Sequence, residues 1–203
     1  MSLPPSVSAY LRQCGSPAAP PLDADSRSLQ GIQAVVVIPA LAEKLYLFST
    51  LASLARNDPG ELERTLVICV INNRPYPLVS REALQDNQET LEILRHLTMG
   101  RFPPPAEADL LLARSCREIL SRGLRLAYLD ASSAHREMPL KKGGVGLARK
   151  WGMDAGIAAM EYRRPDDGWL LCLDGDSPVA ADYLSTVRRF YESGRPVAAV
   201  LSY

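Results

Sequence analysis

The sequence predicts an α/β domain whose mostly parallel sheet is flanked by helices on both faces. Several short, uninterrupted apolar runs are rich in β-branched side chains, and such runs are typical of strands buried on both faces. Segments with apolar residues at helical spacing separate these runs. The alternation of strands and helices along the chain favours a parallel sheet with crossover helices.

Strands and helices are predicted from residue 34 onward. The expected strands cover 34–38, 65–71, 124–129, 169–173 and 197–201. The expected helices cover 43–56, 81–97, 106–121 and 181–191, and a glycine-rich loop followed by a helix covers 141–160. Pro39 is expected to end the first strand because proline lacks a backbone N–H. Ser80 has the side chain of a helix N-cap, and Gly123 stands where a left-handed residue commonly follows a helix.

The first 30 residues differ in composition from the rest of the chain. They contain five prolines among serines and alanines, at positions 4, 5, 17, 20 and 21. Because proline removes backbone donors, this segment is expected to be an irregular arm that either wraps the domain or extends from it. The predicted organisation is therefore an N-terminal arm, 1–30, and one domain, 31–203.

Composition excludes several classes of function. The 203 residues include 23 basic and 23 acidic side chains, and this balance argues against a nucleic-acid partner, which needs a basic surface. No apolar run approaches the ~20 residues of a membrane-spanning helix, and the N-terminus lacks the pattern of a secretory signal. The four cysteines form no C-x-x-C pair, which favours small buried side chains in a reducing, cytoplasmic protein.

Polar residues follow three of the predicted strands, in the loops 39–43, 72–75 and 174–178. Ligands of open parallel sheets bind outside the carboxyl ends of the strands, so these loops are expected to meet. Asp174 and Asp176 flank one glycine, and side chains two residues apart in a strand point the same way. Two such carboxylates suit Mg²⁺ or Mn²⁺. The alternative is a solvated turn, in which Asp and Gly are common.

Four segments in this order resemble motifs of GT-A glycosyltransferases, especially the inverting family 2 enzymes. Residues 170–176, followed by Tyr183 and Leu184, resemble the D-x-D segment of that family. Residues 35–43 are similar to its first strand, V-V-I-P-A-Y-N-E, and residues 67–73 to its second. Residues 144–152 resemble its G-x-G-x-A-R-N-x-G loop and helix, although Lys150 replaces the usual Asn. The resemblance covers 34–203 and implies a GT-A fold.

The resemblance assigns roles to particular residues. It implies that Pro39, Ala40 and Glu43 border a nucleotide pocket, and that Asn73, together with Asn72, meets the base. Family members commonly have a carboxylate there, which accepts the N3–H of uracil. The resemblance favours UDP-sugars, but an amide both accepts and donates, so GDP-sugars remain open.

Three further residues complete the implied site. Arg149 would approach the diphosphate, Asp174 would face the ribose or the sugar, and Asp176, with Asp174, would hold Mn²⁺ or Mg²⁺. A bound cation would neutralise the charge that develops on the β-phosphate as the sugar leaves. The family usually has a shorter connection than the helical insertion at 74–123.

The implied activity is transfer of a sugar from a nucleotide-diphosphate sugar to an unknown glycan, lipid or protein acceptor. Inverting transfer needs a general base, and in the resembled family this base follows the strand that begins here at Val197. The chain is therefore expected to be the nucleotide-binding half of a longer enzyme, truncated before the acceptor-binding half. Its general base is expected outside this chain.

Three other functions fit parts of the sequence. Residues 174–179 also resemble the nucleophile loop of haloacid-dehalogenase-like phosphohydrolases, where the first Asp attacks phosphorus, although that loop normally opens the fold. The glycines at 144 and 146 suggest a dinucleotide-binding domain, but their spacing departs from the usual fingerprint. A non-catalytic module that binds a nucleotide sugar is the remaining alternative.

Overall fold

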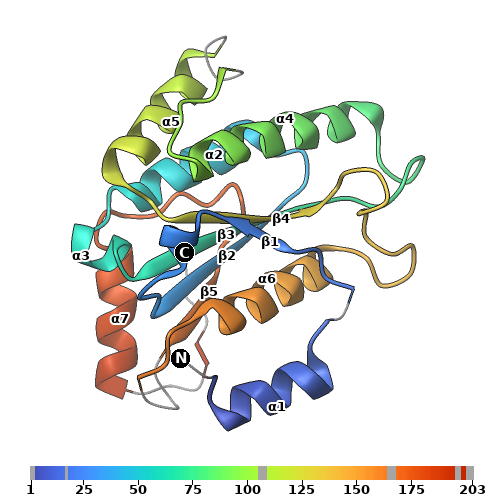
Figure 1. Cartoon of the computed structure of the whole chain (residues 1–203). Helices are drawn as coiled ribbons and strands as arrows, with labels where there is room; N and C mark the ends of the chain where they lie inside the picture. Colours follow the sequence, from blue (N-terminus) through green and yellow to red (C-terminus); the bar gives the residue numbers. More distant parts are fainter. Residues whose placement is uncertain (1–2, 17, 105–108, 164–167, 195–197, 200–203) are drawn as a thin grey trace.

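The structure is a computed structural model that describes residues 3–16, 18–104, 109–163, 168–194 and 198–199 (Figure 1). Its sheet is formed by β1 (Leu22–Ala24), β2 (Ala34–Ala40), β3 (Thr65–Asn72), β4 (Leu126–Ala131) and β5 (Trp169–Cys172). The strand order is β1-β4-β3-β2-β5, in which β1 is antiparallel to β4 and the other pairs are parallel. The α/β class and the mostly parallel sheet are confirmed.

Helices cover both faces of this sheet, as expected. They are α1 (Pro5–Cys14), α2 (Lys44–Ala55), α3 (Pro59–Leu62), α4 (Arg81–Thr98), α5 (Leu110–Arg122), α6 (Val145–Ala159) and α7 (Tyr183–Gly194). Figure 1 shows α2, α4 and α5 on one side of the sheet and α6 on the other, with α1 outside α6. No described helix combines the length and apolar composition needed to cross a membrane.

The central strands β2 and β3 are buried along their whole length. Val36 and Ile38 belong to the core under α2, whereas Val35 and Val37 belong to the core under α6. Both sets must be apolar because successive side chains point to opposite faces, and this explains the uninterrupted runs in the sequence. Helix α6 lies very close to β2, since a Cβ added at Gly152 would be 2.3 Å from Val37 Cγ1.

The expected irregular arm is partly wrong, because the first 30 residues contain α1, β1 and a short 3₁₀ helix, Ser26–Leu29. Pro4 and Pro5 occupy the N-cap and first turn of α1, where a helix needs no backbone donor, so they do not prevent the helix from forming. Strand β1 pairs with β4 at the edge of the sheet. The segment therefore wraps the domain.

The first strand continues through Pro39, contrary to expectation. Leu173 N donates to Val37 O at 3.1 Å, so the backbone of Val37 points toward β5, and that of Pro39 points to the same side. The pairing with β5 ends at Val37. Proline is tolerated because its missing donor falls where the neighbouring strand has already ended.

The third strand starts later than the expected residue 124. The third strand begins at Leu126 because Gly123, in a left-handed conformation, and Leu124 still close α5 by donating to carbonyls of its last turn. Helix α5 begins at Leu110, capped by Asp109, whereas the expected start at 106 lies outside the described residues. The expected strand at 197–201 also falls largely on residues that the structure does not describe.

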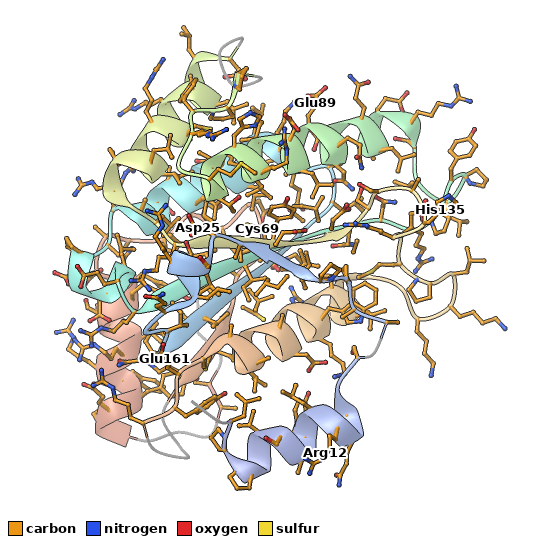
Figure 2. The ribbon with its side chains drawn as sticks, in the orientation of Figure 1. Arg12, Asp25, Cys69, Glu89, His135 and Glu161 are labelled. Atoms are coloured by element: carbon orange, nitrogen blue, oxygen red, sulfur yellow. The ribbon has the colours of Figure 1, made fainter. Side chains whose placement is uncertain are left out.

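All four cysteines are free. Cys69 in the sheet (Figure 2) and Cys116 on α5 are buried, and burial raises the pKa of each thiol to about 12. Cys172 is half-buried and Cys14 is exposed. The prediction of small buried side chains is thus confirmed for Cys69 and Cys116.

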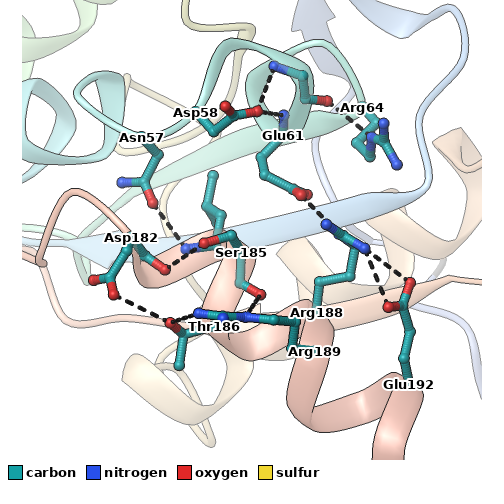
Figure 3. A network of polar contacts seen from close by, with 12 residues as sticks. Asn57, Asp58, Glu61, Arg64, Asp182, Ser185, Thr186, Arg188, Arg189 and Glu192 are labelled. Carbon is teal, nitrogen blue, oxygen red and sulfur yellow. Dashed lines mark hydrogen bonds and ion pairs between the residues drawn. The ribbon is translucent and has the colours of Figure 1, made fainter.

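A polar network fixes α7 against the segment that follows α2 (Figure 3). Arg188 Nε of α7 donates to Glu61 Oε1 of α3 at 2.6 Å, and the Glu61 side chain is only 4% exposed. Asn57 accepts a hydrogen bond from Leu184 N at 2.8 Å and donates to Ala180 O at 3.2 Å. These bonds hold the end of the connection that leads into α7, together with the first half of that helix.

Candidate functional site

A cavity of about 520 Å³ lies at the carboxyl ends of β2, β3 and β5. The three loops expected to meet do meet here. Its lining consists of Pro39, Ala40, Leu41, Glu43, Asn72, Asn73, Arg74, Leu78, Val79, Met138, Gly144, Val145, Asp174, Gly175 and Asp176. Every predicted site residue is in this lining except Arg149. The Arg149 side chain forms an ion pair with Asp174, which is part of the lining.

The loop after β2 is held by a residue that sequence analysis did not identify, Asn87 of α4. Ala42 has a left-handed backbone, with φ 54°, and its N–H donates to Asn87 Oδ1 at 2.9 Å. The Asn87 amide donates to Asn73 Oδ1 at 3.0 Å and to the Asn72 carbonyl at 3.3 Å. Asn87 is 1% exposed, so one buried amide joins the loops after two neighbouring strands.

Neighbouring residues of α4 strengthen this junction. Asp86 Oδ1 accepts from Lys44 N at 3.2 Å, and Glu89 of α4 (Figure 2) forms an ion pair with Lys44 Nζ. Both contacts hold the first residue of α2 in place. The helical insertion at 74–123 therefore has a structural role in the site, because its first helix fixes the border of the cavity.

The two asparagines at the end of β3 have different surroundings. Asn73 accepts from Asn87 and donates through Nδ2 to Arg74 O at 3.1 Å. The Asn72 side chain has no hydrogen-bond partner within the part of the chain that the structure describes, although Asn72 is only 6% exposed and lines the cavity. The amide atoms of Asn72 are not among the buried unpaired atoms of the described residues, so they are accessible at the cavity and free to pair with a ligand.

Asp174 and Asp176 lie in a turn after β5, so the strand alternation used to predict their direction does not apply. Ser177 N donates to Asp174 O at 3.2 Å across this turn. Both residues nevertheless line the same cavity, and both lie close enough to Glu43 for repulsion to raise its pKa. The prediction that the two aspartates converge on one cavity is retained for a different geometric reason.

Helix α2 positions this turn from beneath. Thr50 Oγ1 donates to Gly175 O at 2.8 Å, and Ser53 Oγ accepts from Val179 N at 2.9 Å. Both hydroxyl residues are buried among the apolar residues of α2. They satisfy backbone groups of a segment that makes no strand pairing of its own at these positions.

Glu43 places a third carboxylate beside the turn. A Cβ added at Gly175 would be 2.3 Å from Glu43 Oε2, so the glycine allows this close approach. Partial burial raises the pKa of Glu43 above its ordinary 4.5, and repulsion from Asp176, Asp174 and Asp86 raises it further. The cavity thus gathers negative charge at a cost to the fold.

Glu43→Gln is expected to raise the free energy of unfolding at neutral pH in metal-free buffer. The folded-state pKa lies above the ordinary 4.5, so the ionised carboxylate lowers stability once pH rises through the folded pKa. Below 4.5 both states bind the proton and the penalty disappears. Urea unfolding at several pH values should therefore show a gain that shrinks on acidification. The exposed Glu63→Gln is the control, and a wild type more stable than E43Q at neutral pH contradicts the prediction.

Arg149 of α6 is the cation that contacts this acidic group. Its Nη2 forms an ion pair with Asp174 Oδ1, with the two side chains 37% and 51% exposed. Its Nε is buried and has no hydrogen-bond partner among the residues that the structure describes. The guanidinium is therefore held at the edge of the cavity by one carboxylate, while a second donor remains unpaired.

The chemistry of these side chains fits a hard divalent cation, because carboxylate oxygens are the ligands that Mg²⁺ and Mn²⁺ prefer. Among the described residues, no group of three or more His, Cys, Asp or Glu is arranged to hold a metal ion. A cation here would take its protein ligands from Asp174 and Asp176 and the others from substrate and water. Mg²⁺ is commonly bound in this way, through one or two carboxylates plus phosphate oxygens.

Comparison of the chain with protein-family models, with curated proteins and with solved structures returned no match. The GT-A resemblance therefore stays a prediction that rests on the four sequence motifs.

Proposed function

We propose that this chain binds a nucleoside-diphosphate sugar together with Mn²⁺ or Mg²⁺ and serves a glycosyltransferase. The observation that carries the proposal is the convergence of the first-strand loop, the Asn72–Asn73 pair and the Asp174–Asp176 turn on one cavity. These are the segments that resemble the family motifs, and they come from distant parts of the chain. A volume of about 520 Å³ is in the range of small-ligand pockets.

Each part of the ligand finds a suitable group. The unpaired Asn72 amide offers one donor and one acceptor to the edge of a nucleobase, whereas the Asn73 amide is already engaged. Asp176 and Asp174 supply hard oxygen ligands, and Arg149 supplies a guanidinium for the diphosphate. The cation, when bound, would neutralise charge on the leaving diphosphate. The donor sugar and its acceptor stay open.

Isothermal titration of the wild-type chain tests this function. UDP, GDP and their sugars are titrated in Mn²⁺ and, separately, in EDTA. Binding of at least one nucleotide diphosphate that is lost in EDTA supports the proposal. Absence of nucleotide binding in both buffers contradicts it.

The phosphohydrolase alternative makes a different prediction, because its nucleophile would be Asp174. In the structure this carboxylate is paired with Arg149, which offers no support for a free nucleophile. Release of phosphate from a simple phosphate ester, abolished by Asp174→Asn, would favour that alternative over glycosyl transfer.

A further inference from the structure

The pairing of Arg149 with Asp174 leaves both side chains incompletely satisfied. Arg149 donates to Asp174 through Nη2, while its buried Nε has no acceptor in the described part of the chain. Asp174 in turn lines the cavity beside Asp176 and near Glu43, whose pKa both aspartates raise. A second anion could satisfy the guanidinium better, and a divalent cation could satisfy Asp174 better.

The contact is also weak enough to exchange. Both side chains are more than a third exposed, and half-exposed ion pairs contribute little to stability. A diphosphate offers several oxygens to a guanidinium, which binds such groups through two parallel hydrogen bonds. Arg149 lies on the second turn of α6, and the first turn of that helix, through Val145, lines the same cavity. The guanidinium is thus close to where a ligand would lie.

We propose that Arg149 exchanges partners: it holds Asp174 until a divalent cation takes that carboxylate, and its guanidinium then binds the diphosphate. This inference rests on the proposed function. After the exchange the cation faces Asp174 and Asp176, and Arg149 faces phosphate oxygens. Arg149 therefore opposes binding of the metal alone and favours binding of the metal together with a nucleotide diphosphate, so the two ligands bind cooperatively.

Two titrations of Arg149→Ala test the exchange, with MnCl₂ alone and with UDP in saturating Mn²⁺. We expect Mn²⁺ alone to bind about fivefold more tightly, because Asp174 loses a competing partner. UDP is expected to bind about tenfold more weakly, because a charge-assisted hydrogen bond is lost. A residue that merely fixed α6 to the turn would weaken both ligands or leave both unchanged, so opposite changes identify the exchange.

Two further variants complete the experiment. Arg149→Lys keeps the charge without the two-pronged geometry, and it should retain near wild-type Mn²⁺ affinity while binding UDP less tightly. Arg12→Ala removes an equal charge from the exposed side of α1 (Figure 2) and should change neither affinity. Thermal melting verifies that each variant is folded.

The results distinguish a failure of the Arg149 exchange from a failure of the proposed metal and nucleotide binding. If wild type binds UDP in Mn²⁺ but Arg149→Ala does not bind Mn²⁺ more tightly, the exchange is overturned and the proposed function stands. If wild type binds neither Mn²⁺ nor UDP, the proposed function fails and the exchange fails with it.

Discussion

Replacing Asp176 by alanine is expected to abolish the Mn²⁺-dependent part of UDP binding. Asp176 lines the cavity, and it is the carboxylate of the turn that lacks an ion-pair partner within the described residues. Removing groups that merely orient a metal ligand typically costs 10–100-fold, so loss of a direct ligand should lower the affinity by more than about 100-fold. Isothermal titration of UDP in Mn²⁺ and in EDTA measures this change.

The control for this experiment is Glu63→Ala. Glu63 is exposed and lies just before β3, at the amino end of that strand. The cavity is at the carboxyl end, so the same charge is removed far from the site. This variant should bind UDP like wild type. Unchanged Mn²⁺-dependent binding by D176A would remove Asp176 from the site and leave the proposed metal without its main ligand.

Asn87→Leu is expected to lower the free energy of unfolding by about 3 kcal/mol and to weaken nucleotide binding as well. The substitution leaves three groups in or near the core without their partner: Ala42 N, the Asn72 carbonyl and Asn73 Oδ1. It also releases the left-handed backbone at Ala42, whose N–H makes no other hydrogen bond within the described ranges. Because that loop borders the cavity, stability and affinity should fall together.

Urea unfolding and UDP titration measure both effects of this substitution. Gln88→Leu places the same side chain on the next, exposed position of α4. It removes only two long hydrogen bonds, with the hydroxyls of Ser132 and Ser133, and should therefore lower stability by no more than about 1 kcal/mol. Full nucleotide affinity in a folded N87L protein would show that the junction at Asn87 supports the fold alone.

The sheet and its strand-end residues were predictable because they depend on local patterns. The runs in β2 and β3 are apolar at every position since both faces of the sheet are covered, and that signal is strong in any sequence. The rule that parallel strands present ligand loops at one edge then brought Glu43, Asn73 and Asp176 together without coordinates.

The role of Asn87 was not predicted, although the sequence contains a signal for it. Asn87, Leu91 and Leu94 follow helical spacing and are all buried, so a polar residue stands on the apolar stripe of α4. A buried amide in a helix needs partners from other elements. Which partners it finds depends on how α4 crosses the ends of β2 and β3, and no local pattern encodes that crossing.

The sequence by itself determined the α/β class, the identity of the central strands and the set of polar residues at their ends. Only the tertiary structure decided that residues 5–14 form a helix on α6, that Asp174 and Asp176 converge through a turn, and that Arg149 pairs with Asp174. The physical reason is the distance along the chain between the residues that interact. Burial and hydrogen bonding within an element depend on its own residue spacing, whereas contacts between distant segments depend on how whole elements pack.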